Sequence, residues 1–176
     1  MTYPLAAGLL ACALLAAPAA AQEDTLPVRT QAISVLPLHA AFGFYAGEYE
    51  RAIGETMTLG LGASYFSLGD EADDFFYSSV EVKGRYYPSA DPLKGLSFGI
   101  TAGPTFLRER DNFDGARESI TALGIGFELA RSHILGRDQR FYYGYGGGFK
   151  RLFYSEEGSR GETTIPTLRL SIGYAF

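Results

Sequence analysis

The chain has 176 residues, which suits one domain, and its 15 basic and 20 acidic residues give a net charge of -5. That balance, with a pI of about 5.0, excludes the basic surface by which many proteins bind nucleic acid. The 22 glycines, 12 tyrosines and 13 phenylalanines favour an aromatic-rich β-sheet in which neighbouring backbones approach closely.

Residues 1–21 are predicted to be a secretory signal peptide. They are rich in Ala and Leu, carry no charged side chain, and end in a run of small residues. The single cysteine, Cys12, falls inside this leader, so the mature chain is expected to lack disulfides and thiolate chemistry. Residues 9–12 also have some likeness to a lipoprotein cleavage box, which leaves lipidation as an alternative. No later window has the roughly 18 apolar residues of a transmembrane helix.

Seven later segments alternate apolar with polar or small residues, which is the period-two pattern of a β-strand with one apolar face. Turn or loop residues separate them, and the turn at residues 54–56 is the tightest. These predicted strands are 42–53, 57–68, 76–87, 96–109, 118–133, 140–153 and 163–176.

The charged residues of these segments share one face. In the segment 76–87, Val80 and Val82 lie on one face, whereas Glu81 and Lys83 lie on the other. The last segment has apolar side chains at every second position and ends on an aromatic residue. Each mid-strand charge is therefore predicted to lie opposite the apolar stripe, which is the inverse of a soluble barrel.

An apolar outside and a polar inside are typical of a closed barrel in lipid, because only helices and closed barrels satisfy their own backbone there. Such bacterial barrels have an even number of strands, so residues 30–36 are assigned as the eighth. The predicted fold is an eight-stranded antiparallel transmembrane β-barrel over residues 30–176, an up-and-down meander in the cell outer membrane. Residues 22–29 are expected to be a periplasmic lead-in.

The connections support this orientation because compact and longer ones alternate, as periplasmic turns and outer loops do. The compact turns are 89–94 and 134–138, and the outer connections are 37–41, 69–74, 110–117 and 154–162. Two residues conflict with the pattern, since Pro104 and Pro166 each remove a ladder donor from a predicted strand. Both are expected near the outer ends, at bulges or strand ends.

The inward positions carry a nearly balanced set of charges. An eight-stranded barrel is just wide enough for its side chains to fill, and an unpaired buried charge is very costly. We therefore expect the inward charges to pair as a structural plug, with a proton or ion path as the alternative. The acids are Glu48, Glu50, Glu81 and Glu128, with Glu109 as a further candidate, and the bases are Lys83, Arg85, Lys150 and Arg169.

Other polar groups are weaker candidates for chemistry. His39 and His133 are predicted at opposite ends of the barrel, so they cannot easily share a site. Ser132 beside His133 raises the possibility of a hydrolase, but lipid-deacylating barrels have a His-x-Ser arrangement that is absent here. The acidic run at residues 70–74 could attract Ca²⁺, yet its spacing matches no complete binding loop. No catalytic, cofactor-binding or metal-binding residue is therefore predicted, and no cofactor is expected.

Three segments together resemble a family of small bacterial outer-membrane β-barrel proteins of uncharacterised function, related in architecture to other eight-stranded barrels. They are 48–51 (Glu-Tyr-Glu-Arg), 85–88 (Arg-Tyr-Tyr-Pro) and 168–176, and the likeness spans residues 30–176. The aromatic end at Phe176 also resembles the insertion signal of such barrels. The resemblance implies an outer-membrane location and no known activity.

The predicted role is structural or interactive at the cell envelope, not enzymatic. The expected partners are outer-membrane lipid, lipopolysaccharide and the barrel assembly machinery, which would bind Phe176 and the last strand, and the barrel is expected to be a monomer. The outer loops at 110–117 and 154–162 are the candidates for contacting another partner. A lipid-modifying enzyme and a narrow conductance path are the alternatives.

Overall fold

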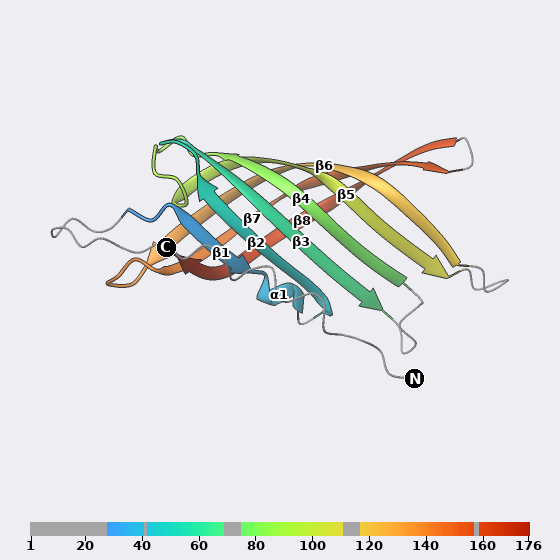
Figure 1. The fold of residues 1–176 in the computed structure, drawn as a ribbon, viewed down its shortest axis with the longest axis horizontal. Helices are drawn as coiled ribbons and strands as arrows, with labels where there is room; N and C mark the ends of the chain where they lie inside the picture. Colours follow the sequence, from blue (N-terminus) through green and yellow to red (C-terminus); the bar gives the residue numbers. More distant parts are fainter. Residues whose placement is uncertain (1–27, 41, 69–74, 111–116, 157–158) are drawn as a thin grey trace.

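The computed structural model describes residues 28–40, 42–68, 75–110, 117–156 and 159–176, and in them eight strands pair in sequence order into one closed antiparallel barrel (Figure 1). This confirms the predicted eight-stranded meander. The strands are β1 (Gln31–Val35), β2 (Phe44–Ala52), β3 (Met57–Leu68), β4 (Phe75–Tyr86), β5 (Gly95–Arg110), β6 (Arg117–Leu135), β7 (Phe141–Glu156) and β8 (Ser159–Ala175).

The two ends of the barrel differ. At one end, which we call the turn end, short connections join β2 to β3, β4 to β5 and β6 to β7. Left-handed residues make these turns tight, and they include Gly95 with φ of 93° and Gly136 with φ of 92°. Phe176 also lies at the turn end, where its backbone bonds to Gln31. The opposite end, the loop end, carries the other connections, including the short helix α1 (Pro37–Ala40).

The strands on the loop side are longer than predicted. β7 ends at Glu156 instead of at residue 153, and β8 begins at Ser159 instead of at residue 163. The paired ladder of β7 and β8 continues to Glu156 opposite Ser159. The polar side chains at residues 154–162 predict a loop. Ladder hydrogen bonds require only backbone groups, however, so polar residues extend the β7–β8 hairpin.

Both prolines lie inside strands, so the predicted placement near strand ends is wrong. Pro104 pairs with Leu123 of β6, whereas its pairing towards β4 stops at Thr105 and resumes at Ala102 in the same register, without a bulge. Pro166 pairs with Phe149 of β7. On its other side β8 pairs with β1 only from residue 172 onward, so the missing donor removes no bond to β1.

The barrel closes through a short seam between β1 and β8. Only residues 32–35 of β1 pair with residues 175–172 of β8. At Gly173 the two backbones approach so closely that an added Cβ would lie 2.0 Å from the Ile33 carbonyl oxygen and 2.7 Å from the Ser34 Cα. Glycine is therefore required at the centre of the seam.

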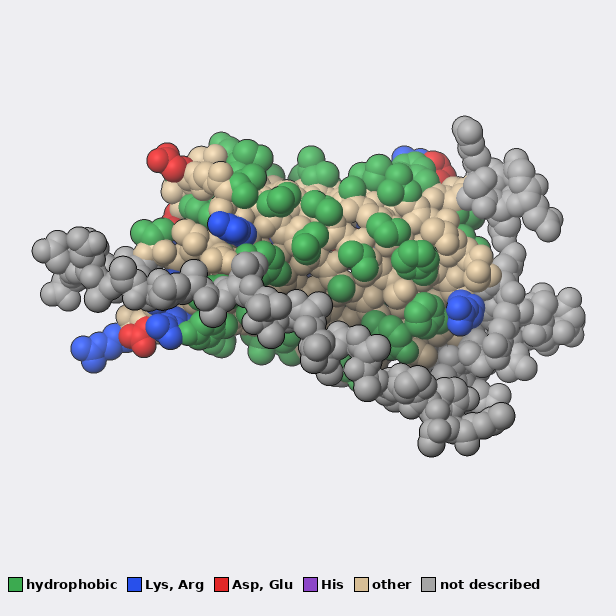
Figure 2. All heavy atoms as spheres, viewed as in Figure 1, with side chains coloured by type: hydrophobic (Ala, Val, Ile, Leu, Met, Phe, Trp, Pro, Cys, Tyr) green, Lys and Arg blue, Asp and Glu red, His purple; other side chains and the backbone are tan. Residues whose placement is uncertain are grey.

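The distribution of side chains is inverted relative to a soluble protein. Among the described residues that are buried, polar and charged side chains outnumber hydrophobic ones. Every strand presents large apolar side chains outward, and Figure 2 shows them spread over the middle of the barrel wall. Within the described ranges, no helix is long and apolar enough to cross a membrane.

Not every charge in the described strands faces inward, although the sequence predicts this for mid-strand charges. Arg131 and Arg151 are exposed and share the outward positions of β6 and β7 with apolar residues such as Phe149. Arg151 lies ten residues beyond Phe141, the first residue of β7. At about 3.3 Å per residue and a tilt of about 45°, this places it roughly 23 Å from the turn end, near the edge of the apolar band of about 25 Å that lipid requires. It pairs there with Glu162.

The seam geometry predicts that Gly173→Ala destabilises the barrel by about 1–3 kcal/mol, because the added methyl group overlaps the β1 backbone. The measurement is the midpoint of guanidinium unfolding in detergent micelles. Gly84→Ala is the matched control, since an added Cβ at Gly84 meets no atom within 4 Å. Equal midpoints for the two variants would show that the seam does not limit stability.

Candidate functional site in the barrel lumen

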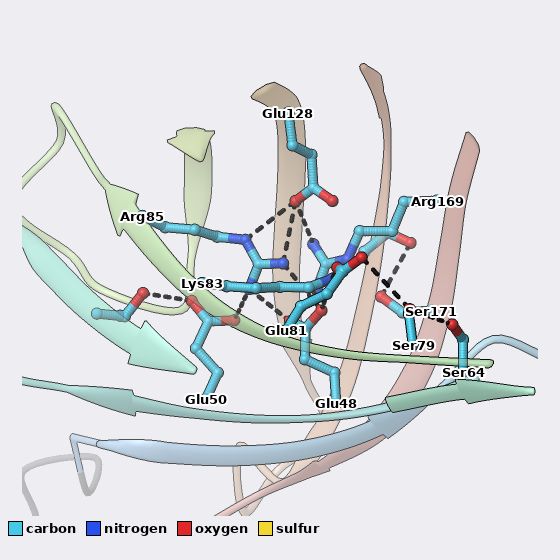
Figure 3. Close-up of polar contacts among 12 residues, drawn as sticks. Glu48, Glu50, Ser64, Ser79, Glu81, Lys83, Arg85, Glu128, Arg169 and Ser171 are labelled. Carbon is cyan, nitrogen blue, oxygen red and sulfur yellow. Dashed lines mark hydrogen bonds and ion pairs between the residues drawn. The ribbon is translucent and has the colours of Figure 1, made fainter. Parts of the chain in front are cut away.

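Eight charged side chains from five strands meet inside the barrel, and we call them the plug. Figure 3 labels all of them except Lys150. They are the four acids and four bases predicted to point inward, so that prediction is confirmed. The side chain of Glu109, the further candidate, lies outside the described residues. The plug consists of Glu48 and Glu50 of β2, Glu81, Lys83 and Arg85 of β4, Glu128 of β6, Lys150 of β7 and Arg169 of β8.

Arg85 lies at the centre of the plug and is only 2% exposed. Its Nη1 donates to Glu48 Oε1 at 2.5 Å and to Glu50 Oε2 at 2.6 Å. Its Nη2 donates to Glu48 Oε2 at 3.0 Å, and its Nε donates to Glu128 Oε1 at 3.0 Å. One guanidinium thus joins β2 and β6 across the lumen through charge-assisted bonds, the stronger class of hydrogen bond.

Glu48 is the acid with the most cationic partners. Besides Arg85, it accepts from Lys83 Nζ at 2.9 Å and from Arg169 Nη2 at 3.1 Å. Arg169 also donates through Nη2 to the Tyr142 hydroxyl at 2.9 Å. The carboxylate therefore connects β2 to β4 and β8, and its removal would leave two buried arginines and the half-buried Lys83 with one acceptor fewer.

A second group of contacts lies around Glu81, which bonds to Lys150. Lys150 also donates to the Tyr77 hydroxyl at 3.1 Å. The Lys83 ammonium lies 3.9 Å from Glu81 and links this group to Glu48. The plug is consequently one connected network with equal numbers of acids and bases.

Neutral hydroxyl groups complete the coordination of Glu50. Thr58 donates to Glu50 Oε1 at 2.6 Å, and Tyr87 donates to the same oxygen at 2.8 Å. Burial first, and then the Glu50 carboxylate, raise the pKa of the Tyr87 phenol well above its usual value, so it stays a proton donor. The sequence prediction missed Tyr87 and Tyr142, although Tyr87 continues the odd-numbered inward positions of Glu81 and Lys83.

Inward glycines on neighbouring strands make room for the long cations. An added Cβ at Gly124 would lie 2.3 Å from Lys150 Cε, and one at Gly62 would lie 3.0 Å from Lys83 Cε. At Gly99 it would lie 3.3 Å from Arg85 Cγ. The glycine content thus sets the shape of the lumen as well as the close approach of strands.

The sequence predicts that side chains fill the whole interior, and the structure shows that they do not. On the loop side of the plug lies a cavity of about 380 Å³. Apolar residues line it together with plug members, among them Phe44, Phe66 and Ile165 beside Lys83 and Arg169. The lumen therefore has a closed part and an open part.

Ser132 and His133 do not form a catalytic pair. Ser132 is buried inside the barrel, where its hydroxyl accepts from Tyr142 at 3.2 Å. His133 stacks against Tyr143, with ring centroids 4.7 Å apart, and lies near Tyr145. The side chain of His39 and residues 70–74 lie outside the described residues. In the part of the chain that the structure describes, no cluster of His, Cys, Asp and Glu could hold a metal ion.

Comparison with known proteins gives one structural neighbour for this barrel. No family model matches the chain, and no curated protein matches it. Among solved structures, the fold is similar to the N-terminal β-barrel domain of OprF from Pseudomonas aeruginosa, with 16% identity and a TM-score of 0.48. The similarity covers 84% of this chain and 98% of that domain.

The plug geometry predicts that Glu48→Gln destabilises the barrel by about 3–5 kcal/mol, because it leaves buried cations uncompensated. Glu162→Gln is the matched control, because it removes the same charge from an exposed pair with Arg151 and should cost about 0–1 kcal/mol. Guanidinium unfolding in micelles measures both. If the two variants unfolded at the same midpoint, the plug would not contribute to stability.

Proposed function

We propose that the chain is an integral barrel of the bacterial outer membrane with a structural or interactive role at the envelope. The observation that carries this proposal is the combination of a closed barrel, an apolar outer wall and a charge-balanced plug. A transmembrane β-strand needs about 9–11 residues, and β3 to β8 have at least 12 each. The barrel acts as a monomer surrounded by lipid and lipopolysaccharide.

The plug argues against an open pore. Arg85 and its carboxylate partners bridge β2, β4 and β6, so a hydrated ion would have to break several charge-assisted bonds to pass. The loop-side cavity ends on this network. The barrel therefore contributes surface and wall to the membrane and does not conduct solutes.

The β7 and β8 hairpin is the better candidate for contact with a partner beyond the membrane. At the loop end it stands apart from the ends of β5 and β6 (Figure 1). Its ladder continues to Glu156 opposite Ser159, and the exposed ion pair of Arg151 with Glu162 lies on its outer face. The predicted outer segment at 154–162 is largely this hairpin, and the segment at 110–117 is the second candidate.

The membrane location predicts heat-modifiable migration, so the unboiled protein should run faster on a denaturing gel than the boiled protein. On a density gradient of cell envelopes it should co-sediment with lipopolysaccharide. A chain that stays in solution without detergent, or that sediments with the inner membrane, would contradict the proposal.

The closed lumen predicts no stepwise current when the folded barrel is inserted into a planar bilayer. A channel of known conductance, inserted into the same bilayer, checks that currents can be recorded. Reproducible single-channel steps from the wild-type chain would refute a plugged lumen.

The end of β8 predicts an assembly signal, with Phe176 as its terminal side chain. Phe176→Ala keeps the backbone bonds to Gln31 and removes only the 39% exposed ring, so the folded barrel should remain stable once formed. Assembly in cells should fall several-fold, measured as the heat-modifiable fraction. Ile172→Ala on the same outward face is the control, and equal effects of the two variants would show that the terminal aromatic has no special role.

A further inference from the structure

The barrel wall is incomplete on the loop side of the seam. β1 ends at Val35, so residues 159–171 of β8 have no strand partner on that side among the described residues. On the other side of this interval, the β1–β2 ladder ends at Val35 opposite Gly47, and Leu36 still donates to the Ala46 carbonyl oxygen at 3.1 Å. Helix α1 contacts both β2 and β8 here. The seam is thus a ladder at the turn end, whereas towards the loop end Leu36 and helix α1 lie against β2 and leave a gap in the hydrogen-bonded wall on the β8 side.

Side-chain exposure shows the same gap. Residues 162–168 of β8 are exposed on both faces, and the alternation of a barrel wall resumes only at the buried Arg169. The neighbouring β7 does alternate at this height, with Lys150 and Leu152 buried between exposed residues. The edge of β8 is therefore open to the lumen and to the outside of the barrel.

The 380 Å³ cavity reaches this gap, because its lining includes both edges. Phe44 and Ala46 come from β2, whereas Ile165 and Thr167 come from β8. Its volume falls in the range of about 300–1,000 Å³ that small-molecule sites occupy. Apolar residues line the part nearer the loop end, and three acids and three cations of the plug line the part nearer the turn end, so the cavity suits a molecule with an apolar chain and a polar end that a plug cation can bind.

Arg169 supplies the unsatisfied donors for such an anion. It is 4% exposed, and only its Nη2 makes hydrogen bonds, to Glu48 and to Tyr142. Nε and Nη1 have no hydrogen-bond acceptor among the described residues, and Nη1 lies 3.9 Å from Glu128 Oε1. Leaving buried donors unpaired is costly, so an added acceptor would be favoured here.

We propose that the cavity binds a long-chain carboxylate, with its head on Arg169 and its alkyl chain passing between helix α1 and the unpaired edge of β8 into the surrounding lipid. The gap faces the apolar wall, so a single chain can reach the lumen without crossing water, and a cavity of this size favours a small head and one chain. This inference rests on the proposed membrane location.

The test uses palmitate carrying a mid-chain diazirine, irradiated in lipid vesicles that contain the folded full-length chain. Mass spectrometry should find labelled lumen-facing residues of β2 and β8, and unlabelled palmitate should compete. Thr167→Trp should reduce this labelling at least tenfold, because Thr167 lines the cavity. Thr164→Trp should leave it unchanged, since Thr164 is exposed on the same strand but does not line the cavity.

Equal labelling of the two variants, or labelling that palmitate does not reduce, would overturn the proposal. If palmitoyl glycerol competed as well as palmitate, the head group would not need a negative charge, and the role of Arg169 would be overturned. If lysophosphatidate competed better than palmitate, the proposed carboxylate would be wrong and the bound head group would be a phosphate. Heat-modifiable migration checks the fold of each variant. Wild-type protein that enters membranes but takes no label refutes this inference alone, whereas failure to enter membranes refutes the proposed function.

Discussion

The contacts of Arg85 with Glu48, Glu50 and Glu128 are the interaction on which the rest of the barrel depends. An apolar outer wall requires charges in the middle of the strands to face mostly inward, where solvation by water is limited and pairing must replace it. Because the three carboxylates come from β2 and β6, the guanidinium also fixes how strands far apart in the sequence face one another. The glycines at positions 62, 99 and 124 follow from this, since they leave the space that the long cations occupy.

The sequence was sufficient to predict the strand number, the meander and the eight members of the plug, because period-two alternation assigns each residue to one face without knowledge of the register. It did not predict Tyr87 or Tyr142, which share that alternation but carry no charge that would have marked them as plug partners. The predicted strand ends were also too short, since the polar residues 154–156 and 159–161 pair through their backbone as readily as apolar ones. The placement of Pro166 depends on where β1 ends, which is a property of the neighbouring strand and not of the segment around the proline.

The short β1 links the stability of the barrel to its proposed binding site. Four residue pairs around Gly173 close the wall, and just beyond them β1 ends while β8 continues without a strand partner on that side. The plug lies at the level where the wall becomes complete, with Arg169 as the first buried residue of β8 below the gap. A chain entering through the gap would therefore meet the plug as the floor of its site. One set of charges would both hold the barrel together and recognise a ligand.

The central claim is that the apolar face of every strand contacts lipid while the charged face lies within the barrel. Nitroxide labels on single cysteines along β5, in a chain with Cys12→Ala, test it most directly. Phe98→Cys, Ile100→Cys and Ala102→Cys are at outward positions, and Ser97→Cys, Gly99→Cys and Thr101→Cys are at inward ones. In lipid vesicles, collision with oxygen should be high at the outward set and low at the inward set, with a period of two residues. Outward labels that collide more readily with a water-soluble nickel chelate than with oxygen would contradict the account.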